Sequence, residues 1–279
     1  PAGLRLASCY FTPKGQPLIP PLEQCFENGF LARGEYNPGG TRHYQYCTAF
    51  PIGTMLAQSW NTCLLQEVGA AVGYEMALFG VSLWLAPGMN IHRSPLCGRN
   101  FEYFSEDPLL SGQMAAAITR GVQSCPGCGV TLKHFACNNQ ETERLESNSL
   151  VSERALREIY LRGFQIAVQS AQPSAIMTSY NLVNGVHAAN SAALCTAIAR
   201  CEWGFAGIFM TDWDTTSSRR CTAEGCIQAG NDLLMPGSRR EYSALLCALR
   251  DGRLDRRLLR SCAGRIIKTA LGLSAPTAP

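Results

Sequence analysis

The 279-residue sequence predicts an α/β fold of the TIM-type (β/α) barrel class. From about residue 48 onward, short apolar runs alternate with longer amphipathic runs, which is typical of successive β/α units around a parallel sheet. Polar or aromatic residues stand at the end of nearly every apolar run. Because the strand ends of a barrel converge on one face, where the active site lies, this placement favours a barrel over an open doubly wound sheet.

The elements follow from the periodicity of apolar residues. Short apolar runs predict strands at residues 48–50, 81–86, 130–133, 175–179, 207–211 and 232–235. Amphipathic patterns predict helices at residues 61–79, 108–123, 152–171, 191–201, 223–229, 241–250 and 255–270. Two starts carry capping signals: Asp107 precedes Pro108, and Ser152 is followed by an early acid.

The segment before these units is of a different kind. Residues 13–40 are rich in Gly and Pro and show no clear periodicity, which indicates a long loop over the barrel mouth or an irregular lead-in. We therefore expect residues 1–47 to be irregular and residues 48–279 to form the β/α units. No internal repeat or interdomain linker is apparent.

Composition excludes several classes of protein. A hydrophobic share of 46% with 16% charged residues is ordinary for a globular domain. The net charge of +3 is too small to indicate binding to nucleic acid or to an anionic membrane, and no apolar run suggests a membrane-spanning helix. Neither a GxGxxG after the first strand nor a GxxxxGK[ST] is present, so dinucleotide and P-loop sites lose their main support.

Fourteen cysteines leave two interpretations. Cys125-Pro-Gly-Cys128 has the spacing of a redox motif or half of a zinc site, but no second close Cys or His pair accompanies it, and it follows a helix rather than a strand. Scattered, mostly unpaired spacing favours buried free thiols in a reducing, cytoplasmic compartment. We expect no metal and no cofactor.

The strongest chemical candidate is Asp212, in the run Gly207-Ile-Phe-Met-Thr-Asp-Trp213. A carboxylate at a strand end, among cationic or hydrogen-bonding neighbours, suits a nucleophile that must stay ionised. Capping of the following helix is an equally good explanation from spacing alone. Trp213 beside it fits a stacking platform for a sugar ring, or a simple rim aromatic.

Four other strand-end residues are candidates. Lys133 is one of only three lysines, and with His134 it ends an apolar strand, although neighbouring strand residues normally point to opposite faces. Arg99 lies in a polar loop and offers a guanidinium fork for sugar hydroxyls, or is simply solvated. Tyr180 either hydrogen-bonds a carboxylate or is a half-buried tyrosine.

These residues lie in longer stretches through which the chain resembles the barrel domain of glycoside hydrolase family 3, in particular its β-glucosidase-like members. The stretches run in the family's order over nearly the whole chain: Pro1-Ala-Gly-Leu-Arg5, Ala49-Phe-Pro51, Leu56-Ala-Gln-Ser-Trp-Asn61, 86–108, 132–141, 152–160, 177–185, Met210-Thr-Asp-Trp213 and 229–237. The resemblance implies that residues 1–279 form one family 3 barrel domain.

The resemblance also implies roles. Asp212 matches the family's nucleophile and Trp213 the neighbouring aromatic. Arg99, Lys133 and His134 fall on residues that hold hydroxyls of the non-reducing-end sugar, and Tyr180 falls on a tyrosine close to the nucleophile.

Two departures from the family pattern matter. Members usually carry Asp-Gly directly before the Pro-x-Gly-Leu-Arg segment, whereas this sequence starts at Pro1, so we expect an incomplete barrel lacking its first strand. β-Glucosidase-like members take their acid/base Glu from a second domain, which we expect as a partner in cis or in trans. Another subgroup uses a His in the loop after Lys133-His134, but residues 136–143 contain none, and Glu141 and Glu143 are better explained as loop carboxylates.

The predicted function is a retaining β-glycosidase that hydrolyses terminal non-reducing β-D-glucosyl or xylosyl residues through a covalent glycosyl-enzyme on Asp212. The alternative is a sugar-binding or degenerate inactive fragment without the acid/base domain. Metal-dependent sugar isomerisation is a distant third, because only Asp212 and His134 would serve as ligands.

Overall fold

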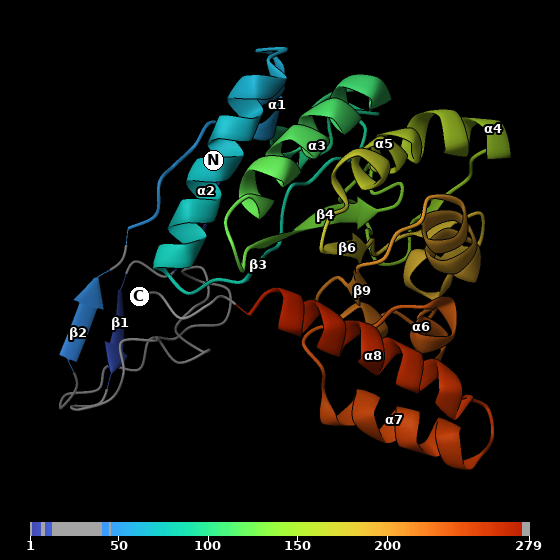
Figure 1. Ribbon diagram of the computed structural model, residues 1–279. Helices are drawn as coiled ribbons and strands as arrows, with labels where there is room; N and C mark the ends of the chain where they lie inside the picture. Colours follow the sequence, from blue (N-terminus) through green and yellow to red (C-terminus); the bar gives the residue numbers. More distant parts are fainter. Residues whose placement is uncertain (1, 7–8, 13–40, 45, 275–279) are drawn as a thin grey trace.

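A parallel sheet forms the centre of the molecule. The computed structural model describes residues 2–6, 9–12, 41–44 and 46–274, so the loop expected at 13–40 lies outside the described residues. The sheet contains β3 (Leu83–Trp84), β4 (Gly129–Phe135), β6 (Ala175–Thr178) and β9 (Ile208–Thr211), in that order. All neighbours pair in parallel, so the carboxyl ends of the strands share one edge (Figure 1). The predicted α/β class, an incomplete TIM-type (β/α) barrel, is confirmed, and these four neighbouring parallel strands form part of the ring.

Two of the predicted strands, at 48–50 and 232–235, are wrong, because each forms only a single β-bridge. At 48–50 only Phe50 forms a bridge, antiparallel to Ala2, because the backbone N–H of Thr48 donates to the Glu75 carboxylate instead. At 232–235 only Leu233 forms a parallel bridge, to Met210 in β9. There the N–H groups of Asp232 and Leu233 both donate to the Phe209 carbonyl, which breaks the regular ladder.

Apart from a short first helix that was not predicted, the helices follow the strands as predicted, with small shifts of their ends. They are α1 (Gly53–Ala57), α2 (Thr62–Leu78), α3 (Pro108–Gln123), α4 (Glu153–Ala155), α5 (Arg162–Ala171), α6 (Ala223–Ala229), α7 (Arg239–Arg250) and α8 (Arg256–Gly272). The predicted N-caps are confirmed, because Asp107 accepts from Leu109 and Ser152 from Ala155. The predicted helix 152–171 contains a π-helical segment, Leu156–Tyr160, and the helix predicted at 191–201 is a π-helix, Ala193–Glu202.

Helices α2 and α3 cross in close contact on one side of the sheet (Figure 1). Gly69 and Gly121 stand at the crossing. A Cβ added at Gly121 would lie 2.1 Å from the carbonyl oxygen of Gln66, and one added at Gly69 would lie 2.4 Å from that of Ile118. Only glycine therefore lets the two backbones approach this closely.

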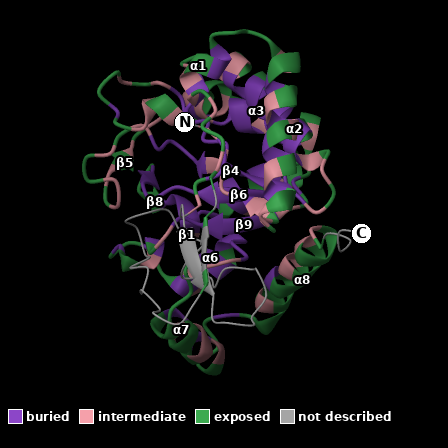
Figure 2. Cartoon of the chain, turned by 90° about the vertical axis from the view of Figure 1, so that its left-hand side faces the viewer, coloured by how far each residue is buried: buried purple, intermediate pink, exposed green. Residues whose placement is uncertain are grey.

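The core is concentrated in the strands and in α3 (Figure 2). All four residues of β6 and of β9 are buried, as expected for strands covered on both faces. Phe135 of β4 packs edge-on against Phe164 and Trp203, with ring centroids 5.2 and 5.9 Å apart. In contrast, α8 buries only Cys262.

Asp232 ties α8 to the sheet through a buried ion network. Its carboxylate accepts from Arg200 at 2.7 Å, from Arg265 of α8 at 2.7 Å and from the backbone N–H of Phe209 at 2.8 Å. The side chain of Asp232 is completely buried. Because each oxygen has a partner, the buried charge is compensated.

Small antiparallel pairs lie outside the main sheet. β1 (Cys9–Thr12) pairs with β2 (Thr41–Tyr44), so part of the segment expected to be irregular at 1–47 is a two-stranded ribbon. β7 (Leu182–Val183) pairs with β8 (Val186–His187) and in parallel with β5 (Asn148–Ser149). Sequence periodicity could not predict two-residue strands.

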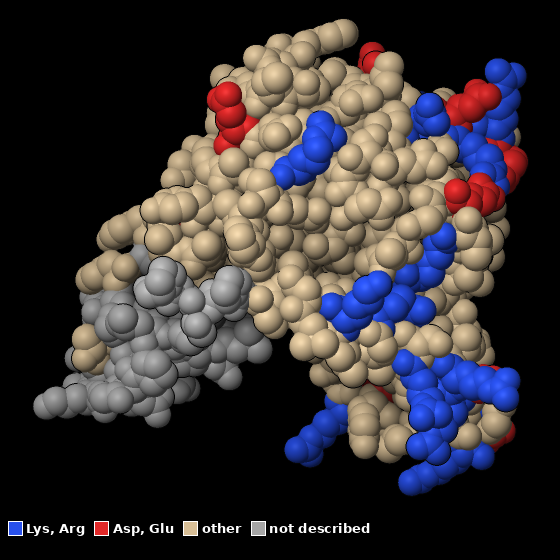
Figure 3. Space-filling view, viewed as in Figure 1, with Lys and Arg blue, Asp and Glu red and all other residues tan. Residues whose placement is uncertain are grey.

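Basic side chains gather over α7 and α8 (Figure 3). The arginines at 250, 253, 256, 257 and 260 are all exposed, as expected for a solvated helix surface. Arg253 pairs with Glu224 and with Asp251. Among the described residues, every helix is too short or too polar to cross a bilayer.

Candidate active site

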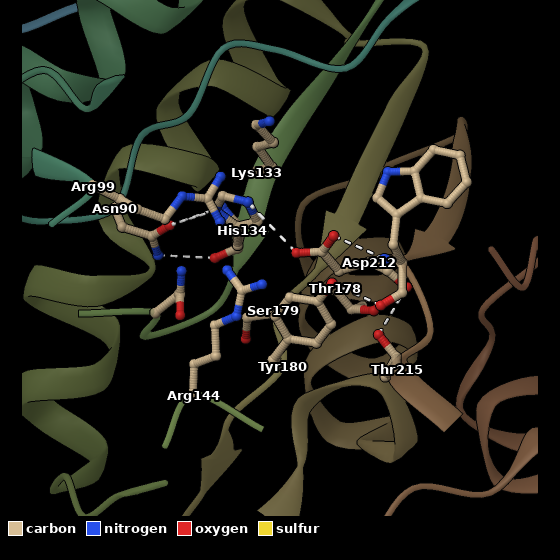
Figure 4. Close-up of polar contacts among 12 residues, drawn as sticks. Asn90, Arg99, Lys133, His134, Arg144, Thr178, Ser179, Tyr180, Asp212 and Thr215 are labelled. Carbon is tan, nitrogen blue, oxygen red and sulfur yellow. Dashed lines mark hydrogen bonds and ion pairs between the residues drawn. The ribbon is translucent and has the colours of Figure 1, made fainter. Parts of the chain in front are cut away.

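A cavity of about 620 Å³ opens at the carboxyl ends of the strands. All six residues predicted for the site line it, as the close-up in Figure 4 illustrates for most of them: Arg99, Lys133, His134, Tyr180, Asp212 and Trp213. Lys133 and His134 lie near the carboxyl end of β4, and the other four lie in the segments that follow β3, β6 and β9, as predicted from the polar strand ends.

Asp212 is the first residue after β9 and is 5% exposed. Its Oδ1 accepts the backbone N–H of Trp213 at 2.8 Å, and its backbone carbonyl accepts the Thr215 hydroxyl at 2.8 Å. The short helical turn that follows, Thr215–Ser217, receives no cap from this carboxylate. The alternative explanation of Asp212 as a helix cap is therefore wrong.

Burial raises the pKa of the Asp212 carboxyl above its ordinary value. The N–H of Trp213 opposes this effect, as do the charges of Lys133 and Arg99. These groups all favour the ionised form, so they limit the cost of a buried carboxylate.

His134 faces Asp212 across the cavity, with Nε2 lying 3.6 Å from Oδ2 (Figure 4). Burial first, and then nearby positive charges, lower the pKa of His134 well below its usual value. The ring is therefore neutral at pH 7, and its contact with the carboxylate is a weak polar contact rather than an ion pair.

Asn90 holds the backbone of His134 in place. Its Nδ2 donates to the His134 carbonyl at 2.8 Å, and its Oδ1 accepts the His134 N–H at 2.8 Å. Behind the ring, the Tyr103 hydroxyl lies 3.3 Å from His134 Nδ1. Asn90 is 2% exposed, so these bonds are shielded from water.

Lys133 and His134 are consecutive, yet both line the same cavity. Strict alternation would place them on opposite faces. The register of β4 against β6 shifts between Leu132 and Phe135, so the regular pleat is interrupted where the two side chains stand. This irregularity explains how two consecutive residues of the strand can line the same cavity.

Glu102 organises the two cations of the cavity. Its carboxylate binds Arg99 Nε and lies 3.9 Å from Lys133 Nζ. Burial lowers the pKa of Lys133, and the charge of Glu102 opposes that change. The carboxylate therefore helps to keep Lys133 charged next to Asp212.

Helix α1 fixes the turn that carries Glu102. The hydroxyl of Thr54 donates to the carbonyls of Asn100 at 2.9 Å and Tyr103 at 3.0 Å. A Cβ at Gly53 would lie 2.6 Å from the Glu102 carbonyl oxygen. The start of α1 thus packs directly on the backbone of this turn.

Tyr180 and Arg144 form another wall. The Tyr180 hydroxyl donates to the Trp213 carbonyl at 2.6 Å, and the Arg144 guanidinium lies 4.8 Å from the centre of the Tyr180 ring. Burial raises the pKa of Tyr180, so the hydroxyl stays protonated. Glu141 pairs with Arg144 at 3.0 Å, which supports its interpretation as a loop carboxylate.

Three further charged residues line the cavity that the sequence did not predict for the site: Glu102, Arg144 and Arg5. Glu102 lies in the loop after β3 that also supplies Arg99. Arg144 lies in the loop after β4, the strand that contains His134. Each loop contains several charged residues, and no periodicity distinguishes the one that turns inward. Apart from Asp212, Glu102 is the one carboxylate lining this cavity among the described residues.

No cluster suited to a metal ion occurs among the described residues. The two thiols of the CxxC motif, Cys125 and Cys128, instead donate to the carbonyls of Ala70 and Gly73 in α2. They pack α2 against the start of β4.

Comparisons with known proteins agree with this geometry. The family model described as the glycosyl hydrolase family 3 N-terminal domain matches residues 33–269. A β-glucosidase of Ruminococcus albus is 44% identical over 248 residues, covering 85% of this chain and 26% of that protein. An exo-α-(1→6)-L-arabinopyranosidase of Bifidobacterium breve is 47% identical over 207 residues, covering 74% and 27%.

Solved structures extend the similarity to the fold. The structure of β-glucosidase 3B from Thermotoga neapolitana in complex with α-D-glucose superposes with a TM-score of 0.79 at 47% identity. The match covers 82% of this chain and 32% of that one. The chain therefore spans between a quarter and a third of the length of these relatives.

Proposed function

The chain belongs to glycosyl hydrolase family 3, as its N-terminal domain, and on that premise we propose that it carries the nucleophile and the sugar-binding subsite of a retaining β-glycosidase. The reaction is the hydrolysis of terminal non-reducing β-D-glucosyl or xylosyl residues through a covalent glycosyl-enzyme on Asp212. The observation that carries the proposal is a single buried carboxylate that shares a sugar-sized cavity with Lys133, Arg99 and a neutral His134.

In the first step, an Asp212 oxygen attacks the anomeric carbon while the bond to the leaving oxygen breaks. The Trp213 N–H orients the carboxylate by donating to Oδ1 of Asp212. The other oxygen, Oδ2, faces His134 and the open cavity. Positive charge develops on the sugar ring in the transition state, and an ionised Asp212 stabilises it. Water then releases the sugar in the second step.

Lys133, His134 and Arg99 bind hydroxyls of the sugar. Their donors converge from β4 and from the loop after β3, so the sugar meets several groups held by different elements. Hydrogen bonds that strengthen as the ring flattens contribute to the rate rather than only to binding. Trp213 supplies an apolar face for the ring.

The acid that protonates the leaving group comes from a partner segment in cis or in trans. Two carboxyl groups about 5–5.5 Å apart suit a retaining mechanism. Glu102 is engaged by Arg99 and Lys133, and Glu141 by Arg144. Both carboxylates are therefore already paired with cations of this chain, and neither is free to face the leaving group.

Covalent labelling with a 2-deoxy-2-fluoro-β-D-glucoside bearing an activated phenol tests the proposal, since a good leaving group needs little acid assistance. Trypsin releases Asp212 within the peptide 201–219, which also contains Asp214. We expect the fluorosugar on Asp212 by tandem mass spectrometry, with none on Asp212→Asn. Asp214→Asn is the matched control, because Asp214 is exposed and does not line the cavity.

Labelling of another carboxylate, or equal labelling of Asp212→Asn, would refute the assignment. Saturable binding of glucose with no labelling and no release of phenol would instead identify a sugar-binding fragment. A panel of aryl β-D-glucoside, β-D-xyloside and α-L-arabinopyranoside then ranks the sugars by kcat/KM.

A further inference from the structure

A second reactive cluster lies outside the cavity, at the start of α6. Cys221 and Cys226 are buried, with their Sγ atoms 3.5 Å apart, and among the described residues they are the one pair of cysteines joined by a hydrogen bond. We propose that they form a reversible disulfide when the protein meets hydrogen peroxide, with Cys221 as the attacking thiol and Cys226 as the resolving thiol.

The two thiols differ in their surroundings. Cys221 is 4% exposed and lies between the exposed residues Arg220 and Thr222, whereas Cys226 is fully buried. Peroxide approaching from solvent therefore reaches Cys221 first. The side-chain amide of Asn190 donates to Cys226 Sγ at 3.3 Å and to the Thr222 carbonyl at 3.0 Å, which holds the second thiol in place.

His187 supplies a proton donor beside Cys221. Its Nδ1 accepts the N–H of Ala189 at 3.2 Å, which places the ring proton on Nε2. That nitrogen is buried and makes no hydrogen bond within the described part of the chain. A thiolate on Cys221 would give this buried donor a charged neighbour.

The electrostatics agree with the assignment of the two thiols. The pKa of Cys221 is lowered to about 6, first by the hydrogen bond from Cys226 and then, against burial, by His187. The pKa of Cys226 is raised, first by the same hydrogen bond and then by burial. Thiolate is the reactive form, so Cys221 is the better nucleophile toward peroxide.

The chemistry balances with peroxide as the oxidant. The Cys221 thiolate attacks one peroxide oxygen, the O–O bond breaks, and hydroxide leaves and takes up the proton lost by Cys221, leaving a sulfenic acid. The Cys226 sulfur then attacks the Cys221 sulfur, the S–O bond breaks, and the hydroxyl leaves as water with the Cys226 proton. Two thiols lose two electrons in all, and one peroxide becomes two waters.

Only a small movement is required. A disulfide bond is about 2.05 Å long, so the sulfur atoms must approach by roughly 1.5 Å. Cys221 precedes the N-cap Thr222, and Cys226 is the central residue of α6. A change of rotamer at either end of this short loop can supply the approach.

The CxxC pair provides a matched control. Trypsin releases Cys221 and Cys226 together in the peptide 221–239, and Cys125 and Cys128 together in the peptide 121–133, with no other cysteine in either. After peroxide treatment, alkylation and digestion, we expect peptide 221–239 to lack two hydrogens and both alkyl groups. Peptide 121–133 should carry two alkyl groups, and prior treatment with dithiothreitol should restore alkylation of peptide 221–239.

Variants separate the two roles. In Cys226→Ser we expect a sulfenic acid on Cys221 that dimedone traps, and in Cys221→Ser no dimedone adduct on Cys226. Full alkylation of wild-type peptide 221–239 at peroxide doses that oxidise the exposed Cys63 would overturn the proposal. Equal bridging of peptide 121–133 would also overturn it, because it would show that proximity in sequence is enough.

Discussion

Replacing Asn90 by alanine tests whether the buried amide positions His134. The substitution leaves the N–H and the carbonyl of His134 without partners in a site that is closed to water. Each unsatisfied buried group costs about 1–3 kcal/mol, so we expect a loss of about 2–6 kcal/mol in the free energy of unfolding. For a chain of this size, the loss corresponds to a fall in Tm of roughly 5–20 °C.

The same change should reduce catalysis. His134 would no longer be held 3.6 Å from Asp212, and misplacement of a group at the reacting centre costs up to about 100-fold in rate. Stability is measured by urea denaturation followed by circular dichroism. Activity is measured as kcat/KM for an aryl β-D-glucoside, at a temperature where the variant is folded.

Asn184 offers a matched control. It makes the same pair of bonds, with the N–H and carbonyl of Val151 at 2.9 and 2.8 Å, but it is exposed. Its φ of 50° is left-handed, so glycine removes the side chain without adding strain. We expect Asn184→Gly to cost about 1 kcal/mol or less and to leave kcat/KM unchanged, because water replaces the lost partners. Equal destabilisation by the two substitutions would refute the reasoning from burial, and unchanged activity of folded Asn90→Ala would refute the positioning of His134.

Three further predictions concern charge. Asp212→Gly should abolish release of an activated phenol, measured by absorbance. Added azide should partly restore phenol release and yield a glycosyl azide, detected by mass spectrometry, and absence of both effects would contradict a nucleophilic Asp212. Lys133→Met removes a charge that lowers the raised pKa of Asp212, so the acidic limb of the pH profile of kcat/KM should move to higher pH, because Asp212 must be ionised to attack. Lys268→Met, on the exposed face of α8, is the control and should leave the acidic limb in place. If the limb also stays fixed in Lys133→Met, a group other than Asp212 determines it. Asp232→Ala leaves Arg200 and Arg265 facing one another without their carboxylate and should cost about 3–5 kcal/mol in urea unfolding. Glu202→Ala breaks an exposed pair with Arg157 and should leave the urea midpoint almost unchanged, so similar shifts in the two variants would contradict the distinction.

The elements that the sequence predicts well are those with local causes. Buried parallel strands read as short apolar runs, and the capping groups Asp107 and Ser152 mark their helices. The runs at 48–50 and 232–235 look the same in sequence, but their backbone groups bind Glu75 and Phe209 in a way that depends on distant residues. Local pattern carries no information about such partners.

The site divides in the same way. Strand-end position identifies Lys133, His134 and Asp212, since the topology brings these ends together. The sequence could not predict Glu102 and Arg144, because the direction of their side chains depends on contacts made in the folded loops. Glu102 contacts Arg99 and Lys133, and Arg144 lies over the ring of Tyr180. The cluster at Cys221 was hidden for the same reason, since His187 and Asn190 approach it from another segment.

The two hydrogen bonds from Thr54 of α1 to the Glu102 turn restrict which residues this domain can accept at position 54. Thr54 is not among the residues that line the cavity, yet its hydroxyl secures both ends of the turn whose carboxylate orders Arg99 and Lys133. In a saturation library selected for turnover, position 54 should be nearly as restricted as the pocket itself, with Ser retained and Val rejected although Val matches Thr in shape. Exposed positions of the same helix, such as Met55, should accept most residues.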